Sequence, residues 1–99
     1  MKFEWDHAKA AKNRRKHGVT FEEAKEVIHH PLSITISDLE HSQIDEREKT
    51  IGFSSQGRIL VVIHTESRNE TIRLISARKA ERSEVDAYEE EIKWQNKQS

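Results

Sequence analysis

The chain contains no cysteine, one proline, three glycines and no long apolar run. Without cysteine it can build neither a disulfide framework nor a thiolate zinc site. No apolar run approaches the roughly 20 residues of a membrane-spanning helix, and the N-terminal MKFEWDHAKA lacks the apolar core of a signal peptide. The hydrophobic content is only 33%, yet the apolar residues recur periodically, which argues against disorder. We therefore expect a small cytoplasmic protein without a membrane contact.

The formal net charge of −1 conceals two basic blocks that alternate with two acidic ones. Residues 1–17 hold six Lys or Arg and two acids, and residues 58–82 hold six basic residues and three acids. Residues 18–48 hold eight acids against two basic residues, and residues 83–99 hold five acids against two. Such blocks can neutralise each other in the fold. Alternatively, the basic blocks gather into a patch that binds nucleic acid, because local patches rather than the pI of 6.6 decide binding.

The apolar periodicity predicts a single domain, residues 1–99, with the element order β-α-α-β-β-β-β-α. Asp6 and Gly18 are suited to cap a first helix, and Thr20 with Glu23 forms a capping box for a second. The expected elements are a strand over 2–5, helices over 7–17 and 21–30, strands over 33–38, 47–54, 58–65 and 71–77, and a helix from 83. Short turns favour an antiparallel meander of about four strands with the helices on one face, a two-layer α+β fold.

One face of the first expected helix is basic and able to form hydrogen bonds. Its residues follow at i, i+3, i+4, i+7 and i+8, and we call them the basic stripe: Lys9, Lys12, Asn13, Lys16 and His17. Such a face is suited to a phosphate backbone. The alternative is an ordinary solvated helix face.

Arginines recur along the last two expected strands and the turn between them. Arginine is a poor filler for a strand interior because its charge must be paired or hydrated, whereas its planar fork is suited to phosphate. The set comprises Arg58, Arg68, Arg73 and Arg78, with Lys79 beside the last. A tight turn brings His64 and Glu66 close to Arg73, which offers acid–base chemistry on a phosphodiester. The alternative is a cross-strand ion pair with a half-exposed histidine.

Arg73 and Arg78 differ by an odd number of positions, so a regular strand would point them to opposite faces. A bulge near Ser76 would realign them, or the strand ends before Arg78 and the turn re-aims it. If neither holds, only one of the two can reach a phosphate, and we prefer Arg78.

Six histidines raise the question of a metal site. The pair at 29 and 30 lacks the i, i+4 spacing of a helical site, and no H-E-x-x-H is present. His41 with Asp38 and Asp45 is an alternative that could hold a divalent ion in a loop. We expect no metal and no cofactor.

The chain resembles the BrnT family over about residues 2–90. The first matching stretch comprises Phe3-Glu4-Trp5-Asp6, Lys9, Asn13, Lys16-His17-Gly18-Val19 and Phe21-Glu22-Glu23-Ala24. The later stretch comprises Ile51-Gly52, Gly57-Arg58, Leu60-Val61-Val62, Thr65-Glu66, Ile72-Arg73, Ile75-Ser76-Ala77-Arg78-Lys79-Ala80 and Tyr88-Glu89, and Asp38, His41-Ser42 and Arg47 lie between. Ile28 and Leu74 depart from the usual Phe and Ile, and neither touches a polar candidate.

The resemblance implies a bacterial type II toxin with a RelE-like ribonuclease fold. It also implies an RNA substrate and a BrnA-type antitoxin encoded beside it. That antitoxin would block the toxin and carry the DNA-binding part of the repressor complex, so the toxin would meet DNA only indirectly. We expect an acidic or amphipathic antitoxin helix to cover the basic surface.

With this resemblance, the residues predict a metal-independent endoribonuclease in which the RNA 2′-OH attacks the adjacent phosphate. Arginines would stabilise the transition-state charge, Glu66 or His64 would be the base, and His17 is a rival as base or acid. The expected catalytic set is Arg78, Arg73, Glu66, His64, His17 and Arg68. The expected RNA-binding set is Lys9, Lys12, Asn13, Lys16, Arg58 and Lys79. The alternatives are a module that binds RNA or antitoxin without catalysis, and a structural partner of the antitoxin.

Overall fold

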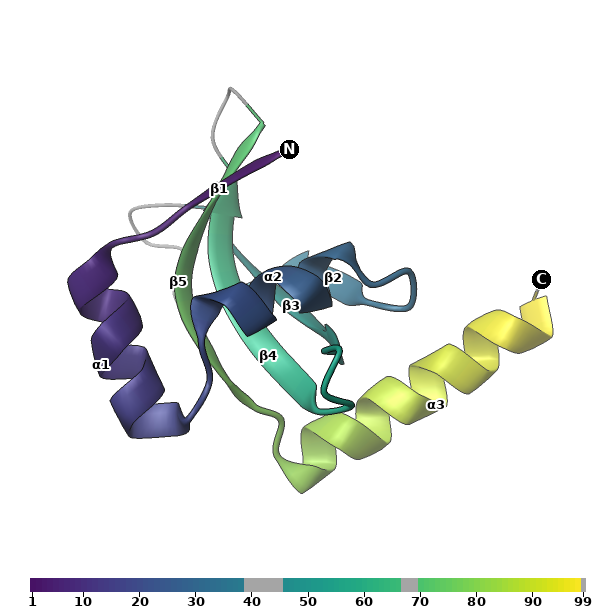
Figure 1. Ribbon diagram of the computed structural model, residues 1–99. Helices are drawn as coiled ribbons and strands as arrows, with labels where there is room; N and C mark the ends of the chain where they lie inside the picture. Colours follow the sequence, from purple (N-terminus) through teal and green to yellow (C-terminus); the bar gives the residue numbers. More distant parts are fainter. Residues whose placement is uncertain (39–45, 67–69, 99) are drawn as a thin grey trace.

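A computed structural model describes residues 1–38, 46–66 and 70–98 of the chain. Within these residues, five strands form one mixed sheet and three helices lie around it (Figure 1). The elements are β1 Lys2–Glu4, α1 His7–His17, α2 Phe21–His29, β2 Ile34–Ser37, β3 Arg47–Phe53, β4 Ile59–Glu66, β5 Thr71–Lys79 and α3 Arg82–Gln98. The α+β class and the predicted order of elements are confirmed.

The first two helices begin and end where their capping residues dictate. Asp6 accepts a hydrogen bond from the Lys9 N–H at 3.0 Å, and Gly18 ends α1 with φ of 69°, a left-handed conformation that suits glycine. Thr20 Oγ1 accepts a hydrogen bond from the Glu23 N–H at 3.1 Å and starts α2. The chain therefore turns between α1 and α2 within three residues.

The strands run in the order β1-β5-β4-β3-β2. The meander from β2 to β5 is antiparallel as expected, whereas β1 pairs with β5 in parallel after the chain has passed through both helices, β2, β3 and β4. One face of this sheet, which we call the core face, packs against α2. The core comprises Val19, Phe21, Ala24, Val27, Leu60, Val62, Ile72, Leu74 and Ala77.

The three helices do not share one face of the sheet, contrary to expectation. On the core face, α2 packs against β3: a Cβ at Gly52 would lie in ordinary contact with Val27 Cγ1 of α2, at 3.5 Å. The next residue, Phe53, points the opposite way and contacts Tyr88 of α3 with ring centroids 5.8 Å apart. The Tyr88 hydroxyl donates a hydrogen bond to the Leu32 carbonyl at 2.8 Å. From this anchor α3 extends away from the sheet (Figure 1).

Helix α1 covers the part of the β5 edge that β1 leaves unpaired. β1 pairs only with residues 71–73 of β5. Farther along, Asn13 takes the place of a strand: its Oδ1 accepts the Ala77 N–H at 3.1 Å and its Nδ2 donates to the Ala77 carbonyl at 2.8 Å. Nδ2 also donates to the Val19 carbonyl at 3.0 Å, and the residue is only 7% exposed. At this edge of the sheet, the two backbone groups of Ala77 are therefore satisfied by a single side-chain amide.

Replacing this amide should destabilise the fold. Asn13→Ala leaves one buried N–H and two carbonyl groups without their partners, which should lower the free energy of unfolding by about 2 to 3 kcal/mol. Urea denaturation measures this loss. Arg15→Ala, at an exposed position on the same helix, should change the value by less than about 0.5 kcal/mol. Equal effects of the two substitutions would show that Asn13 does not hold the edge.

Candidate active site

Strand β5 contains a bulge at Ile75. The residues of β4 that pair with Leu74 and Ser76 are consecutive, so Ile75 between them has no partner on β4. Because of the extra residue, Arg73 and Arg78 point to the same face although they are five positions apart. This face lies opposite the core face. The bulge is the first of the two solutions that the sequence allowed.

A cleft of about 400 Å³ opens on this face, between the C-terminal end of α1 and strands β3 to β5. We call it the basic cleft, and it is lined by Lys16, His17, Asp38, Arg47, Lys49, Ile63, Ser76 and Arg78. Its floor follows from strand pairing, because Lys49 pairs with Ile63 and Ile63 pairs with Ser76. Arg47 lies two residues before Lys49 on β3, and Arg78 lies two residues after Ser76 on β5, so the two arginines flank this row of paired residues on opposite sides.

A second hollow of about 180 Å³ between α1 and β5 adjoins the basic cleft. It is lined by Lys9, Lys12, Asn13, Lys16, His17, Ile75 and Ser76. Lys16, His17 and Ser76 line both spaces. The lysines of the basic stripe therefore form a track of positive charge that leads into the basic cleft.

Arg78 is held in the cleft by Glu84 from the first turn of α3. Its Nη1 donates to Glu84 Oε1 at 2.7 Å and its Nη2 donates to Oε2 at 2.9 Å. These hydrogen bonds lower the pKa of the Glu84 carboxyl to about 2, and the same contact raises the pKa of Arg78. Both groups are charged at neutral pH, and they link α3 to the basic cleft.

His64 and Glu66 do not reach the basic cleft, so the expected grouping with Arg73 is wrong. Arg73 pairs with Thr65, and the residues on either side of Thr65 point to the core face. His64 is 4% exposed, and its Nε2 lies 2.7 Å from Thr50 Oγ1. Its Nδ1 has no hydrogen-bond partner among the described residues, and burial lowers its pKa. Neither residue is placed to act on a phosphate in the cleft.

Arg58 and Lys79 also lie away from the basic cleft, on the side of α2. The Arg58 guanidinium binds both carboxylate oxygens of Glu23, with Nε to Oε2 at 2.9 Å, and Nη2 also donates to the Gly18 carbonyl at 3.2 Å. Arg58 and, more weakly, the charge of Lys79 lower the pKa of Glu23. Arg58 therefore takes part in an ion pair that joins α2 to the start of β4, away from the cleft that gathers the other cations. Asn13 is likewise occupied, by the edge of β5.

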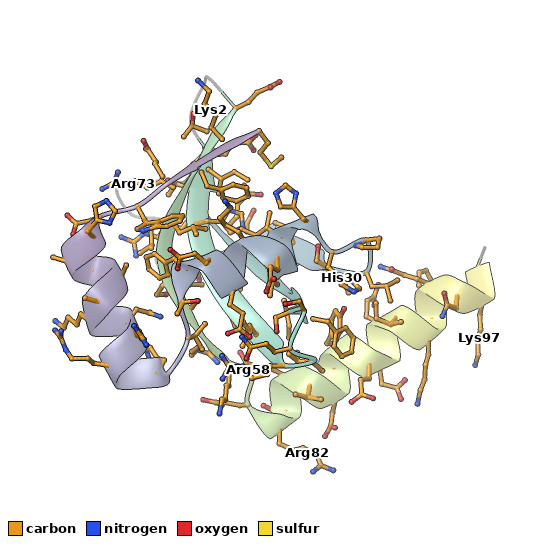
Figure 2. The ribbon with its side chains drawn as sticks, in the orientation of Figure 1. Lys2, His30, Arg58, Arg73, Arg82 and Lys97 are labelled. Carbon is orange, nitrogen blue, oxygen red and sulfur yellow. The ribbon has the colours of Figure 1, made fainter. Side chains whose placement is uncertain are left out.

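Arg73 lies on the correct face but beyond the end of the cleft. Its Nη1 lies 3.5 Å from Glu4 Oε1, and Figure 2 shows it at the opposite end of the sheet from Arg58. Arg68 lies outside the described residues. The sequence-predicted residues that the structure brings together along the two adjoining hollows are Lys9, Lys12, Asn13, Lys16, His17 and Arg78.

Five further residues of this region were not predicted as catalytic or RNA-binding residues, although Asp38 was considered as a metal ligand. They are Asp38, Arg47, Lys49, Ser76 and Glu84. Arg47 and Lys49 could have been found from the sequence. Strand residues two positions apart share a face, so the predicted strand places Arg47, Lys49 and Ile51 on the same face of β3. Glu84 had no such signal, since its pairing with Arg78 depends on the direction in which α3 leaves the sheet.

The alternative metal site at 38, 41 and 45 falls largely outside the described residues. In the parts of the chain that the structure describes, no three His, Asp or Glu side chains gather as ligands for an ion. Over the same ranges, none of the helices combines the length and the apolar character needed to cross a membrane.

The fold and the cleft define a small α+β protein with a surface for a polyanion, since lysines and arginines from a helix and two strands converge on one face. The family model described as "Ribonuclease toxin, BrnT, of type II toxin-antitoxin system" matches residues 5–84, so the chain belongs to the BrnT family. The resemblance seen in the sequence is confirmed. The family description identifies a ribonuclease, hence an enzyme that acts on RNA, and implies an antitoxin partner.

The fold is similar to the crystal structure of the Brucella abortus ribonuclease toxin BrnT, with a TM-score of 0.65 and 26% sequence identity. The match covers 83% of this chain and 99% of the Brucella chain. No curated protein sequence matches the chain.

The buried His64 should make stability depend on pH. Its pKa in the fold lies below the ordinary value of 6.5, so the unfolded chain takes up the proton first as the pH falls. The contribution of neutral His64 to the free energy of unfolding is complete above pH 6.5 and is lost as the pH falls toward the pKa that His64 has in the fold. Between pH about 7.5 and about 5.5, the wild type should therefore lose more free energy of unfolding than His64→Gln, with a slope of at most about 1.4 kcal/mol per pH unit. Parallel pH profiles of the two proteins would contradict this account.

Proposed function

We propose that this chain is a metal-independent endoribonuclease and that the basic cleft is its active site. The observation that carries the proposal is the convergence of Arg78, Arg47, Lys49 and Lys16 around His17 in one cleft. Fixed cations stabilise the negative charge that develops on a phosphate under attack. His17 supplies a titratable group within the same space.

The reaction uses a nucleophile that RNA already contains. The 2′ oxygen forms a bond to the adjacent phosphorus while the bond from phosphorus to the 5′ oxygen breaks. One proton leaves the 2′-OH and one reaches the 5′ oxygen, so a group such as His17 can serve either transfer. The basic stripe holds the flanking phosphates and thereby fixes the register of the RNA.

The ends of the RNA products test this chemistry. Digestion of a defined RNA in the presence of EDTA should yield 2′,3′-cyclic phosphate and 5′-hydroxyl ends, read by mass spectrometry. Products with 5′-phosphate ends, or cleavage only after a divalent metal is added, would contradict the mechanism. RNA that is bound and left intact would favour the alternative of a binding module.

Arg78 should contribute more to cleavage than any other arginine that the structure describes. Arg78→Ala should lower the cleavage rate by about 100- to 1,000-fold, because it removes a charged donor aimed at the phosphate. Arg82→Ala is the matched control, since Arg82 is 91% exposed, pairs only with Asp86 among the described residues, and lies at the start of α3 in Figure 2. Circular dichroism verifies that both variants are folded. Unchanged cleavage by Arg78→Ala would place the active site elsewhere.

We further propose that the partner is a BrnA-type antitoxin encoded beside this gene, that the pair acts in the cytoplasm, and that this chain meets DNA only through the antitoxin. The family description of a type II toxin–antitoxin system supports a protein partner. The surplus of cations around the basic cleft favours an acidic antitoxin segment over it, because opposite charges steer association.

An apolar groove of about 210 Å³ continues from the basic cleft and extends this proposed antitoxin surface. It is lined by Ile34, Ile36, Lys49, Ile51, Val61, Glu84, Ala87, Tyr88 and Glu91. Lys49 lines both the groove and the cleft. An amphipathic antitoxin helix can therefore bury its apolar face in the groove while its acidic residues cover the cleft.

This docking mode predicts that Ile36→Glu weakens the antitoxin complex at least about tenfold, because Ile36 lines the groove and is 54% exposed. RNA cleavage should stay unchanged, because Ile36 does not line the basic cleft. Leu32→Glu is the control, since Leu32 is 43% exposed but does not line the groove. Surface plasmon resonance measures both affinities. It should also show an association rate that falls with salt. Equal losses for the two variants, or a rate indifferent to salt, would indicate a different docking site.

A further inference from the structure

Glu84 has a fixed geometry that the proposed reaction has not yet used. Its Oε1 accepts the Glu81 N–H at 2.8 Å, in the manner of a capping-box glutamate, so the start of α3 fixes its carboxylate. The same carboxylate binds both terminal nitrogens of Arg78. Glu84 therefore connects the end of a helix to the arginine that we place on the phosphate.

The hydrogen bonds of Arg78 leave one edge of its guanidinium open. A guanidinium has five N–H groups in one plane. Nη1 uses its two on Glu84 Oε1 and on the Lys79 carbonyl at 3.3 Å, and Nη2 uses one on Glu84 Oε2. Among the hydrogen bonds of the described residues, the Nε–H and the second Nη2 N–H remain. These two lie parallel on one edge, the arrangement that binds a phosphate through two oxygens.

We propose that Glu84 is a positioning residue for RNA cleavage, which holds Arg78 by its Nη1–Nη2 end so that the Nε–Nη2 edge receives a phosphate in the basic cleft. This inference rests on the proposed function. A guanidinium fixed in this way loses little rotamer freedom when the phosphate binds, so more of the contact is available to the transition state.

The opposite role is that Glu84 competes with the phosphate for Arg78. Displacement of the carboxylate would leave a partly buried charge without its arginine, which is unfavourable. Because a complete bidentate edge stays open while Glu84 is bound, the phosphate does not need to displace it. The geometry therefore favours positioning over competition.

Single-turnover cleavage of a short RNA by the full chain tests the role of Glu84. Glu84→Gln keeps an oxygen that can accept one bond from Arg78 and should slow cleavage about tenfold. Glu84→Ala should slow it about 100-fold, with a smaller change in the RNA concentration at half-saturation, because the misplaced arginine mainly affects the transition state. Asp86→Asn, which loses the exposed pair with Arg82 on the same helix, should cleave like the wild type.

A double-substitution cycle separates positioning from a purely structural role. In an Arg78→Ala background, Glu84→Ala should have no further effect, because the residue acts through Arg78. Additive losses would show that Glu84 only supports α3, and faster cleavage by Glu84→Ala would show that it competes with RNA. Either result overturns this inference while Arg78→Ala remains impaired. If Arg78→Ala cleaves normally, the proposed active site itself fails.

Discussion

The bulge at Ile75 is the constraint on which both faces of the sheet depend. Leu74 and Ala77 are both buried in the core although they are three positions apart, and a regular strand would send them to opposite faces. The same extra residue places Arg73 and Arg78 together on the other face. A single irregularity therefore completes the core and places a cation in the basic cleft.

The alternating charge blocks of the sequence serve two purposes in the fold. Some opposite charges neutralise each other: Glu23 of α2 binds Arg58, and Glu84 of α3 binds Arg78. The lysines of the basic stripe instead gather with the cations of β3 along one continuous surface. The fold therefore pairs some of the opposite charges and gathers other cations into one basic patch. The pairing of Arg78 differs from that of Arg58, because Arg78 lines the basic cleft while it is paired.

The local parts of this structure could be predicted from the sequence. Asp6, Gly18 and Thr20 set the bounds of the first two helices because capping depends on residues only a few positions apart. The basic stripe could also be found, because helical spacing alone places its lysines on one side. Arg78 was chosen from its place at the end of a strand, and the structure does place it in the cleft.

The parts that depend on distant pairing could not be predicted. His64 and Glu66 were expected beside Arg73 because a tight turn joins their strands. In the fold Thr65 pairs with Arg73, so His64 and Glu66 point to the other face of the sheet. Asn13 has the spacing of a surface residue, and only the unpaired edge of β5 shows that it is structural. The direction of α3 likewise depends on Tyr88 reaching across to β3.

The most direct test of the basic cleft is an NMR titration with an RNA whose 2′ oxygens are methylated, so that it binds without being cut. The account predicts that the side-chain Nε–H signal of Arg78 shifts on binding. The corresponding signal of Arg58, which Glu23 already holds on the side of α2, should stay in place. A shift at Arg58 with none at Arg78 would contradict the assignment of the basic cleft as the RNA site.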